Sequence, residues 1–229
     1  MDGTLLNTED LYTEAATILL AKYGKGPLSW EVKIQLQGRP GPEAIKILLK
    51  EYDIEETPEV WQQQANIVQD TLWQRAQFVP GALELLEYLS EKKIPIALGT
   101  SSNTFSYKKK TDHLQSGFKY FGEHIVTGDD ERIPKGKGKP HPDIWYVCLQ
   151  SINDERNKLN LPEIKPHECL VFEDGIPGVE SGINAGARVI WIPHPEALPI
   201  LNGKEHEIIG DHGEILTQLK NFDPSKYNL

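Results

Sequence analysis

The spacing of apolar residues divides the chain into a helical first part and a second part in which strands and helices alternate. Between residues 8 and 72 apolar side chains recur every three or four positions, which is the period of an amphipathic helix. Glycine and proline interrupt this period, and the continuous apolar runs typical of buried strands do not occur here. The pattern predicts helices over 8–23, 30–36, 44–48 and 58–72.

From residue 79 onward the pattern changes. Short continuous apolar runs indicate strands that are buried on both faces, and amphipathic stretches between them indicate helices. Predicted strands lie at 94–98, 124–126, 169–172 and 188–192. Predicted helices lie at 82–90, 105–114 and 143–149, after Pro177, and at 213–220. Such alternation is typical of an α/β fold with a doubly wound parallel sheet. We expect this core to comprise residues 1–6 and 79–229, with residues 7–78 inserted as an all-helical domain.

Composition and charge restrict the classes of partner. The formal net charge is −10 and the isoelectric point is near 5.2, so nucleic acid and anionic membrane surfaces are disfavoured as main partners. The two cysteines, Cys148 and Cys169, lie in apolar runs and indicate reduced core residues. No apolar run approaches membrane-spanning length, and the first residues lack a signal-peptide pattern. We expect a cytoplasmic monomer that binds neither nucleic acid nor membrane.

Four segments carry chemically useful side chains at the ends of predicted strands or in loops beside them. Two carboxylates end the apolar run at 169–172, and three hydroxyls follow the run at 94–98. A carboxylate lies in an Asp-Gly-Thr turn at the start of the chain, and a lysine lies in a loop rich in glycine and proline. The carboxyl ends of parallel strands meet at one edge of a sheet, so these side chains are expected to converge. They are Asp2, Thr100, Ser101, Ser102, Lys139, Glu173 and Asp174.

This set of residues suits a phosphate ester and a divalent cation. Carboxylates hold Mg²⁺, which prefers oxygen ligands and usually keeps phosphate and water as partners. Hydroxyl and backbone N–H groups at a strand-to-helix turn bind phosphate oxygens, and a lysine neutralises the transferring group. Plainer interpretations exist for each segment: Asp174 as a helix cap, the hydroxyls as a polar turn, and Lys139 as part of a solvated loop. The lysines at 108–110 are predicted to form a solvated helix face.

Residues 2–6, 96–102, 138–143 and 171–175 resemble, in this order, the four motifs of the haloacid dehalogenase-like (HAD) hydrolases. The resemblance covers nearly the whole chain and implies a Rossmann-like core. The helical insert resembles the small cap domain of the branch that contains β-phosphoglucomutase and pseudouridine-5′-phosphatase. The second and fourth motifs are most similar to those of the pseudouridine-5′-phosphatase group.

The resemblance implies roles for the carboxylates. Asp2 would protonate the leaving oxygen, then activate water, and also lend its backbone carbonyl to Mg²⁺. Asp174 would bind Mg²⁺ directly, and Glu173 would serve beside it as a ligand or through water.

The resemblance also implies how a phosphate group would be held. Thr100 would bond a phosphoryl oxygen together with the N–H groups of Ser101 and Ser102. Lys139 would bridge the phosphoryl group and the nucleophile. In the insert, Gly38 and Arg39 occupy a glycine- and proline-rich loop that would contact the substrate.

One part of the family pattern has no counterpart in this sequence. In HAD hydrolases the nucleophile is an aspartate at the end of an apolar strand, two positions before the residue that matches Asp2. In this sequence Met1 directly precedes Asp2, so the position of the nucleophile lies before the first residue given. Without that carboxylate no aspartyl-phosphate forms, and the neighbours of the missing strand keep unpaired backbone groups. We expect a misplaced start or a truncated form of the chain. The alternative is a non-enzymatic relative.

Three hypotheses for function remain. The first is a Mg²⁺-dependent phosphatase that hydrolyses a small phosphorylated metabolite, such as a sugar phosphate or a nucleoside monophosphate, through an aspartyl-phosphate. The second is a phosphosugar mutase like β-phosphoglucomutase, which the resemblance disfavours because Gly41 stands where that enzyme has a phosphate-binding arginine. The third is a non-catalytic scaffold or sensor.

Overall fold

The apolar runs of the second part of the chain form parallel strands in the computed structural model, which describes residues 1–39 and 41–229. β1 and β2 form one sheet, and β3, β4 and β5 form another in that order. Every pair is parallel, with Leu98 opposite Ile125 and Val171 opposite Val189. The strands are β1 (Leu98–Gly99), β2 (Ile125–Val126), β3 (Leu170–Glu173), β4 (Arg188–Trp191) and β5 (Gly213–Ile215). The predicted α/β class is confirmed.

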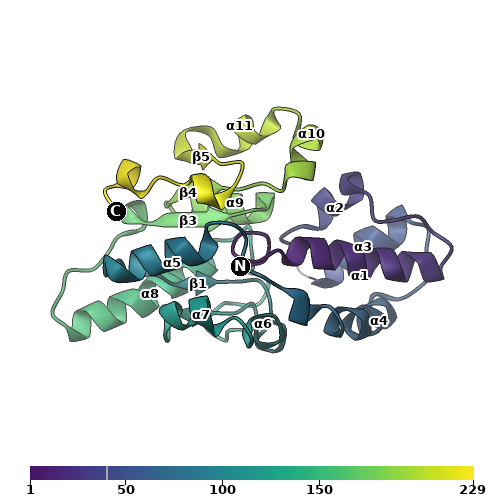
Figure 1. The fold of residues 1–229 in the computed structure, drawn as a ribbon, viewed down its shortest axis with the longest axis horizontal. Helices are drawn as coiled ribbons and strands as arrows, with labels where there is room; N and C mark the ends of the chain where they lie inside the picture. Colours follow the sequence, from purple (N-terminus) through teal and green to yellow (C-terminus); the bar gives the residue numbers. More distant parts are fainter. Residues whose placement is uncertain (40) are drawn as a thin grey trace.

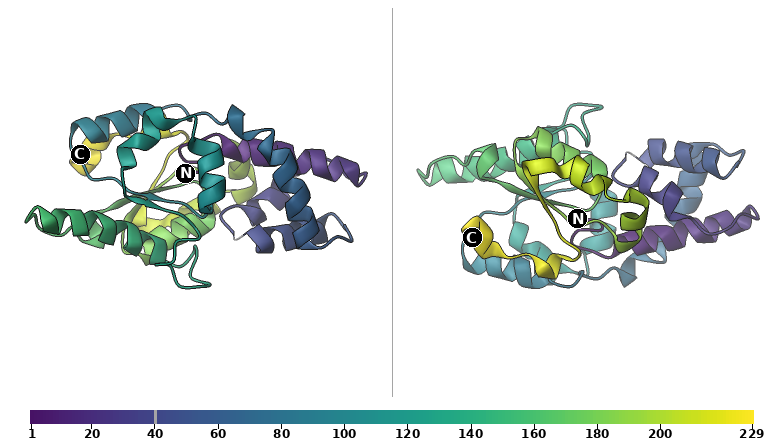
Figure 2. Two further views of the ribbon diagram at one scale, coloured as in Figure 1. Left: turned by 90° about the horizontal axis from the view of Figure 1, so that it is seen from below. Right: turned by 90° about the horizontal axis from the view of Figure 1, so that it is seen from above.

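Helices cover the strands on both sides. α8 packs against β1 and β2, α9 packs against β3 and β4, and α5 lies on the opposite side (Figure 2). The helices of this part are α5 (Ala82–Glu91), α6 (Thr104–Thr111), α7 (Gln115–Phe118), α8 (Asp143–Lys158), α9 (Ile176–Asn184), α10 (Leu198–Leu201) and α11 (Lys204–Ile209). Short 3₁₀ turns lie at Trp73–Arg75, Lys119–Phe121, Pro166–Glu168, Pro195–Ala197, Gly210–His212, Leu219–Asn221 and Pro224–Tyr227.

The first part of the chain forms a group of helices beside the α/β body (Figure 1). Thr57 caps α4 by accepting a hydrogen bond from the N–H of Val60, and Pro58 occupies the first turn, where its missing N–H has no cost. The buried Trp61 anchors a separate apolar cluster within this group. The helices are α1 (Thr8–Lys22), α2 (Trp30–Leu36), α3 (Gly41–Glu51) and α4 (Pro58–Asp70). The domain boundaries at residues 7 and 79 stay a prediction.

β1 and β3 face each other without pairing, and an apolar cavity of about 260 Å³ separates them. The carbonyls of Cys169 and Glu173 accept hydrogen bonds from the side of β4. Because backbone groups alternate along a strand, the peptide groups of Leu170 and Phe172 face the cavity. Met1 and Leu5 also line it. The two sheets therefore present unpaired edges to this cavity, which one further strand could pair with.

The tail differs from the prediction of a helix over 213–220. Residues 213–215 instead pair with β4 as β5, and a 3₁₀ turn follows at Leu219–Asn221. A Cβ atom at Gly213 would lie 1.8 Å from the carbonyl oxygen of Val189, so glycine allows the close approach of the two strands. The helices α10 and α11 were missed because both are short. The predicted strand 94–98 pairs only from Leu98, where β2 begins beside it.

Candidate functional site

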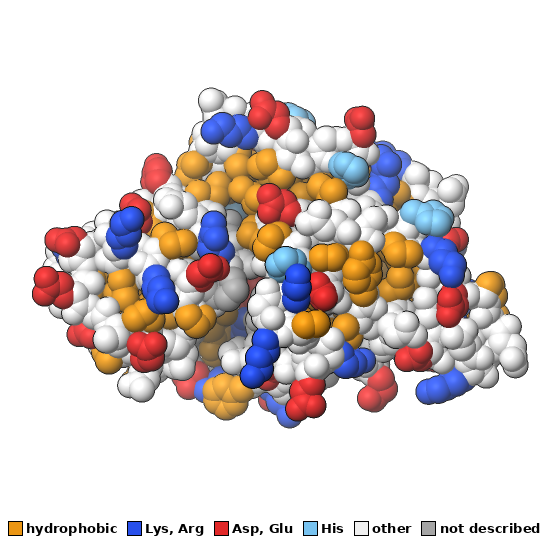
Figure 3. Space-filling model, turned by 180° about the vertical axis from the view of Figure 1, so that it is seen from behind, with side chains coloured by type: hydrophobic (Ala, Val, Ile, Leu, Met, Phe, Trp, Pro, Cys, Tyr) orange, Lys and Arg blue, Asp and Glu red, His pale blue; other side chains and the backbone are white. Residues whose placement is uncertain are grey.

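A cavity of about 540 Å³ lies between the carboxyl ends of the strands and the helices α1 to α4. The molecular surface is hollowed between these two parts in Figure 3, where basic and acidic side chains are intermixed. All of the site residues predicted from the sequence line this one cavity. They are Asp2, Gly38, Arg39, Thr100, Ser101, Ser102, Lys139, Glu173 and Asp174.

Lys139 and Glu173 form a buried ion pair at the base of the cavity. The ammonium of Lys139 donates to Oε1 of Glu173 at 2.6 Å and to the carbonyl of Gly99 at 3.3 Å. Gly178, in the first turn of α9, makes room for this pair, since a Cβ atom there would lie 2.1 Å from Oε2 of Glu173. The resemblance assigned Glu173 to a metal, directly or through water, but in this structure its carboxylate is bound to Lys139.

Asp174 is a half-buried carboxylate with no ion-pair partner among residues 1–39 and 41–229. Its oxygens accept only from neutral groups, Nε2 of Gln37 at 3.2 Å and Oγ1 of Thr4 at 3.5 Å. Burial, followed by the negative charges of Glu9 and Glu173, raises the pKa of Asp174 well above its ordinary value. The N-terminal ammonium acts in the opposite direction, but its effect is smaller than those of burial and of the two acids.

No group of three or more histidine, cysteine, aspartate or glutamate side chains forms a metal-binding cluster in the described parts of the chain. A cation at this site would consequently depend on Asp174, backbone oxygens and water rather than on a cage of side chains. Such sparse protein ligation matches the way proteins hold Mg²⁺, with one or two carboxylates and several waters.

Asp2 lies at the rim in a dense set of hydrogen bonds. Oδ1 accepts from Oγ1 of Thr8 at 2.6 Å and from the ammonium of Lys110 at 2.7 Å. Oδ2 accepts from Oγ of Ser102 at 3.0 Å. Burial alone would raise the pKa of Asp2, but the positive charges of Lys110 and of the N-terminus, together with the hydrogen bonds from Lys110 and Thr8, outweigh it and lower the pKa to about 2. These partners therefore favour the ionised form of Asp2 in the present chain.

The prediction that the lysines at 108–110 form a solvated face is wrong for Lys110. Its side chain is 0% exposed, whereas Lys108 is exposed. Burial would lower the pKa of Lys110, but the charge of Asp2, the hydroxyl of Tyr12 and the hydrogen bonds to both together outweigh it and raise the pKa above the ordinary value. The sequence did hold a signal, because Tyr107 and Leu114 are apolar at three and four positions from Lys110 and both pack on the core.

The hydroxyl motif forms the turn after β1. Oγ1 of Thr100, which is buried, accepts from the N–H of Ser102 at 3.2 Å. The backbone of Ser101 lies close to Gly128. A Cβ atom at Gly128 would lie 2.3 Å from the carbonyl oxygen of Ser101. Residues 100–102 thus line the cavity wall, and their role in binding phosphate stays a prediction.

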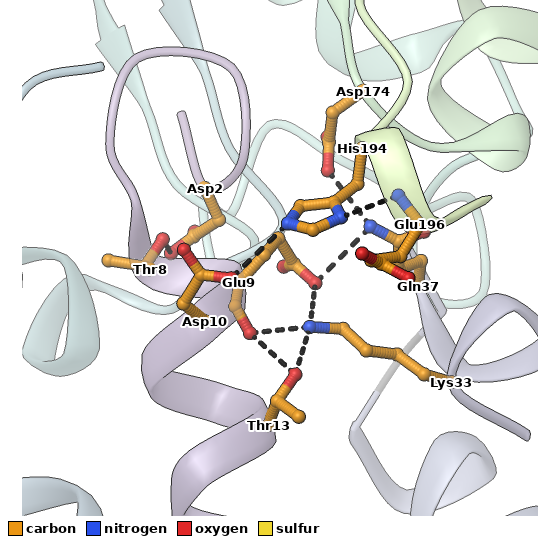
Figure 4. A network of polar contacts seen from close by, with 10 residues as sticks. All are labelled: Asp2, Thr8, Glu9, Asp10, Thr13, Lys33, Gln37, Asp174, His194 and Glu196. Atoms are coloured by element: carbon orange, nitrogen blue, oxygen red, sulfur yellow. Dashed lines mark hydrogen bonds and ion pairs between the residues drawn. The ribbon is translucent and has the colours of Figure 1, made fainter. Parts of the chain in front are cut away.

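Side chains of the helical insert reach the same cavity (Figure 4). The ammonium of Lys33 contacts the carboxylate of Glu9 at 3.2 Å and also Oγ1 of Thr13. Nε2 of Gln37 lies 3.2 Å from both Oε2 of Glu9 and Oδ2 of Asp174. Sequence reasoning missed these residues, because nothing in a helical pattern shows that a polar position faces a neighbouring body.

The two insert residues that were predicted to contact substrate lie at the cavity mouth. Arg39 is exposed, and its Nε donates to the carbonyl of Gln35 at 2.7 Å. Gly38 has a φ of +70° and lies against Pro177 of α9. The loop thus touches the first turn of the helix that follows Asp174.

The model of the haloacid dehalogenase-like hydrolases matches residues 1–186. The chain belongs to this family. It is 50% identical over 229 residues to the Probable pseudouridine-5′-phosphatase of Saccharomyces cerevisiae, which covers 100% of this chain and 94% of the relative. It is 32% identical over 232 residues to (DL)-glycerol-3-phosphatase 2 of Arabidopsis thaliana, covering 100% of this chain and 89% of the relative.

Among solved structures, a putative β-phosphoglucomutase from Thermotoga maritima is similar to this HAD hydrolase, with a TM-score of 0.66 and 26% sequence identity. The similarity covers 96% of this chain and 92% of the other. The predicted family and its Rossmann-like core are thereby confirmed. Within the described residues of this HAD hydrolase, no helix is both long and apolar enough to cross a membrane.

Proposed function

We propose that this HAD hydrolase is a Mg²⁺-dependent phosphatase of small phosphorylated metabolites that acts through an aspartyl-phosphate. The observation that carries the proposal is the charge arrangement at the cavity. Glu9, Asp2 and Glu173 each have a lysine partner, whereas Asp174 has none among the described residues. The names of the yeast and plant relatives, both phosphatases, support the same reaction class.

The residues present fit a magnesium ion. Asp174 is an oxygen donor that lacks a positive partner, and the backbone carbonyl of Asp2 would complete the protein's share of the ligands. Glu173, which is bound to Lys139, would act through water. When bound, the ion would neutralise charge on the phosphoryl group.

The other rim residues would hold the phosphate group. Lys139 presents a buried ammonium at the cavity base. Thr100 and the N–H groups of Ser101 and Ser102 supply the hydrogen bonds that an anionic group needs at a strand-to-helix turn. Fixed donors of this kind stabilise charge that develops on the transferring group, because they need no reorganisation during the reaction.

The nucleophilic aspartate would lie on a strand in the cavity between β1 and β3, in a longer form of this chain. That cavity is apolar, has unpaired backbone on both sides and is bordered by Met1. A strand parallel to its neighbours would end at the rim, beside Asp2. Asp2 would donate a proton to the leaving oxygen when the aspartyl-phosphate forms, and would accept a proton from water when it is hydrolysed.

Specificity would reside in the helical insert, taken as a cap domain of residues 7–78. Gly38 and Arg39 border the cavity mouth, and closure of the insert would exclude water from the site. Substrates of the size of a sugar phosphate or nucleoside monophosphate suit a cavity of about 540 Å³. A cytoplasmic location and a monomeric state complete the proposal.

Phosphate release tests the proposal. The present chain and a form extended upstream to include the predicted nucleophile are incubated with a panel of phosphate monoesters, with Mg²⁺ or with a chelator. We expect release by the extended form with Mg²⁺ only, and its loss on Lys139→Ala. If neither form hydrolyses any ester, a non-catalytic role replaces the proposal. Conversion of one sugar phosphate isomer to another without release of phosphate would favour the mutase.

A further inference from the structure

Lys110 is a buried cation that the proposed chemistry does not use. It lies on α6, a core helix, and its ammonium contacts three oxygens: Oδ1 of Asp2 at 2.7 Å, Oγ of Ser102 at 2.7 Å and the hydroxyl of Tyr12 at 3.0 Å. It also lies 5.1 Å from the ring of Tyr12 and 5.4 Å from the ring of Trp73. Every face of the ammonium is thus occupied by the protein.

The contacts fix both oxygens of the Asp2 carboxylate. Lys110 binds Oδ1 directly, and it also binds the hydroxyl of Ser102, which donates to Oδ2 at 3.0 Å. Rotation of the carboxylate would break one of these contacts. Lys110 therefore determines where the two oxygens point, directly and through Ser102.

The same ammonium joins the rim to both ends of the helical insert. Tyr12 lies in the first helix of the insert, and Trp73 lies in the turn just beyond its last helix. Their rings pack edge to face with centroids 5.0 Å apart. An apolar side chain would fill the space between two aromatic rings without the desolvation cost of a charge. A lysine at this place is consequently explained by the carboxylate that it binds.

We propose that Lys110 is a positioning residue that holds the Asp2 carboxylate in place as the base for hydrolysis of the aspartyl-phosphate. This inference rests on the proposed function. In the step concerned, the oxygen of water bonds to phosphorus and the bond from phosphorus to the aspartyl oxygen breaks. The proton of water passes to Asp2, leaving inorganic phosphate and a free nucleophile carboxylate.

The test separates the two halves of the reaction with p-nitrophenyl phosphate, whose leaving group departs without a proton. The extended chain is compared with its Lys110→Met and Lys110→Arg variants, and Tyr12→Phe removes one contact of the ammonium while keeping the lysine. Lys108→Met, an exposed position on the same helix, is the matched control. Rapid mixing records the initial burst of p-nitrophenolate and the steady rate that follows.

For Lys110→Met we expect a burst of about one p-nitrophenolate per protein, followed by a steady rate at least tenfold below wild type. Lys110→Arg should recover part of that rate, Tyr12→Phe should lose about twofold to threefold, and Lys108→Met should match wild type. A burst amplitude that falls together with the steady rate would reveal a merely structural role and overturn the inference. An unchanged steady rate would overturn it as well. If the wild-type extended chain releases nothing, the proposed function fails, and the inference fails with it.

Discussion

Replacement of Asp2 by asparagine removes one negative charge and leaves Lys110 buried without its partner. The pKa of Asp2 falls from 3.8 to about 2 on folding, and at 1.36 kcal/mol per unit this corresponds to about 2.5 kcal/mol of stability at neutral pH. Breaking a buried ion pair by removing one partner typically costs 3–5 kcal/mol, about the same size. We expect Asp2→Asn to lower the free energy of unfolding by about 3 kcal/mol at pH 7.

The cost of Asp2→Asn in unfolding free energy should depend on pH. A carboxyl group with a lowered folded pKa contributes stability above its unfolded pKa and loses it as the pH falls through the folded pKa. The difference between wild type and Asp2→Asn should therefore be constant above about pH 5 and about half as large near pH 3. Urea unfolding followed by tryptophan fluorescence measures both curves. Asp112→Asn, an exposed site next to α6, serves as the control and should stay within about 0.5 kcal/mol of wild type. A cost of Asp2→Asn below about 1 kcal/mol, or one independent of pH, would refute the assigned ion pair.

Three further substitutions test the remaining parts of the site. Gly178→Ala should cost about 1–3 kcal/mol in urea unfolding, because the added methyl forces Glu173 off the ammonium that holds it; an unchanged midpoint would contradict this packing. Asp174→Asn should raise the melting temperature of the metal-free protein by removing an acid whose ionised form is disfavoured by Glu9 and Glu173, and should abolish stabilisation by added Mg²⁺; a lower melting temperature would show that the carboxylate already has a partner. Gln37→Ala should cost only about 1 kcal/mol, since it loses two hydrogen bonds to carboxylates, but in the extended chain it should raise KM severalfold by loosening the insert; an unchanged KM would remove Gln37 from the cavity wall.

Hydrophobic periodicity was sufficient to predict helices and strands that bury one continuous face. Residues 30–36 were predicted as a helix and form α2 with those bounds, and the strands predicted at 169–172 and 188–192 form β3 and β4 within one residue at each end. It failed where a neighbouring strand decides the conformation. Gly213 to Ile215 carries too few apolar residues to indicate a strand, and it becomes β5 because β4 offers it a free edge.

The motif residues of the site were predictable, whereas their partners were not. Parallel strand ends meet on one edge, so Thr100 and Asp174 had to lie near each other in any doubly wound sheet. Lys110 could be placed only in part, since the apolar Tyr107 and Leu114 mark its side of α6 as buried but do not name its partner. Nothing comparable places Gln37, which ends α2 and faces a second body, because a single helical pattern does not distinguish that face from one in solvent.

The three acid–lysine pairs join segments of the site that are far apart in the sequence. The paired residues are separated by 24, 34 and 108 positions, and each pair joins a different set of segments. Burial makes each lone charge costly, so any one pair stabilises the approach of its two segments. The lysines at 33, 110 and 139 are thereby committed to carboxylates. Asp174 stays the acid without such a partner in the described chain, and a cation drawn to the cavity finds its strongest attraction there.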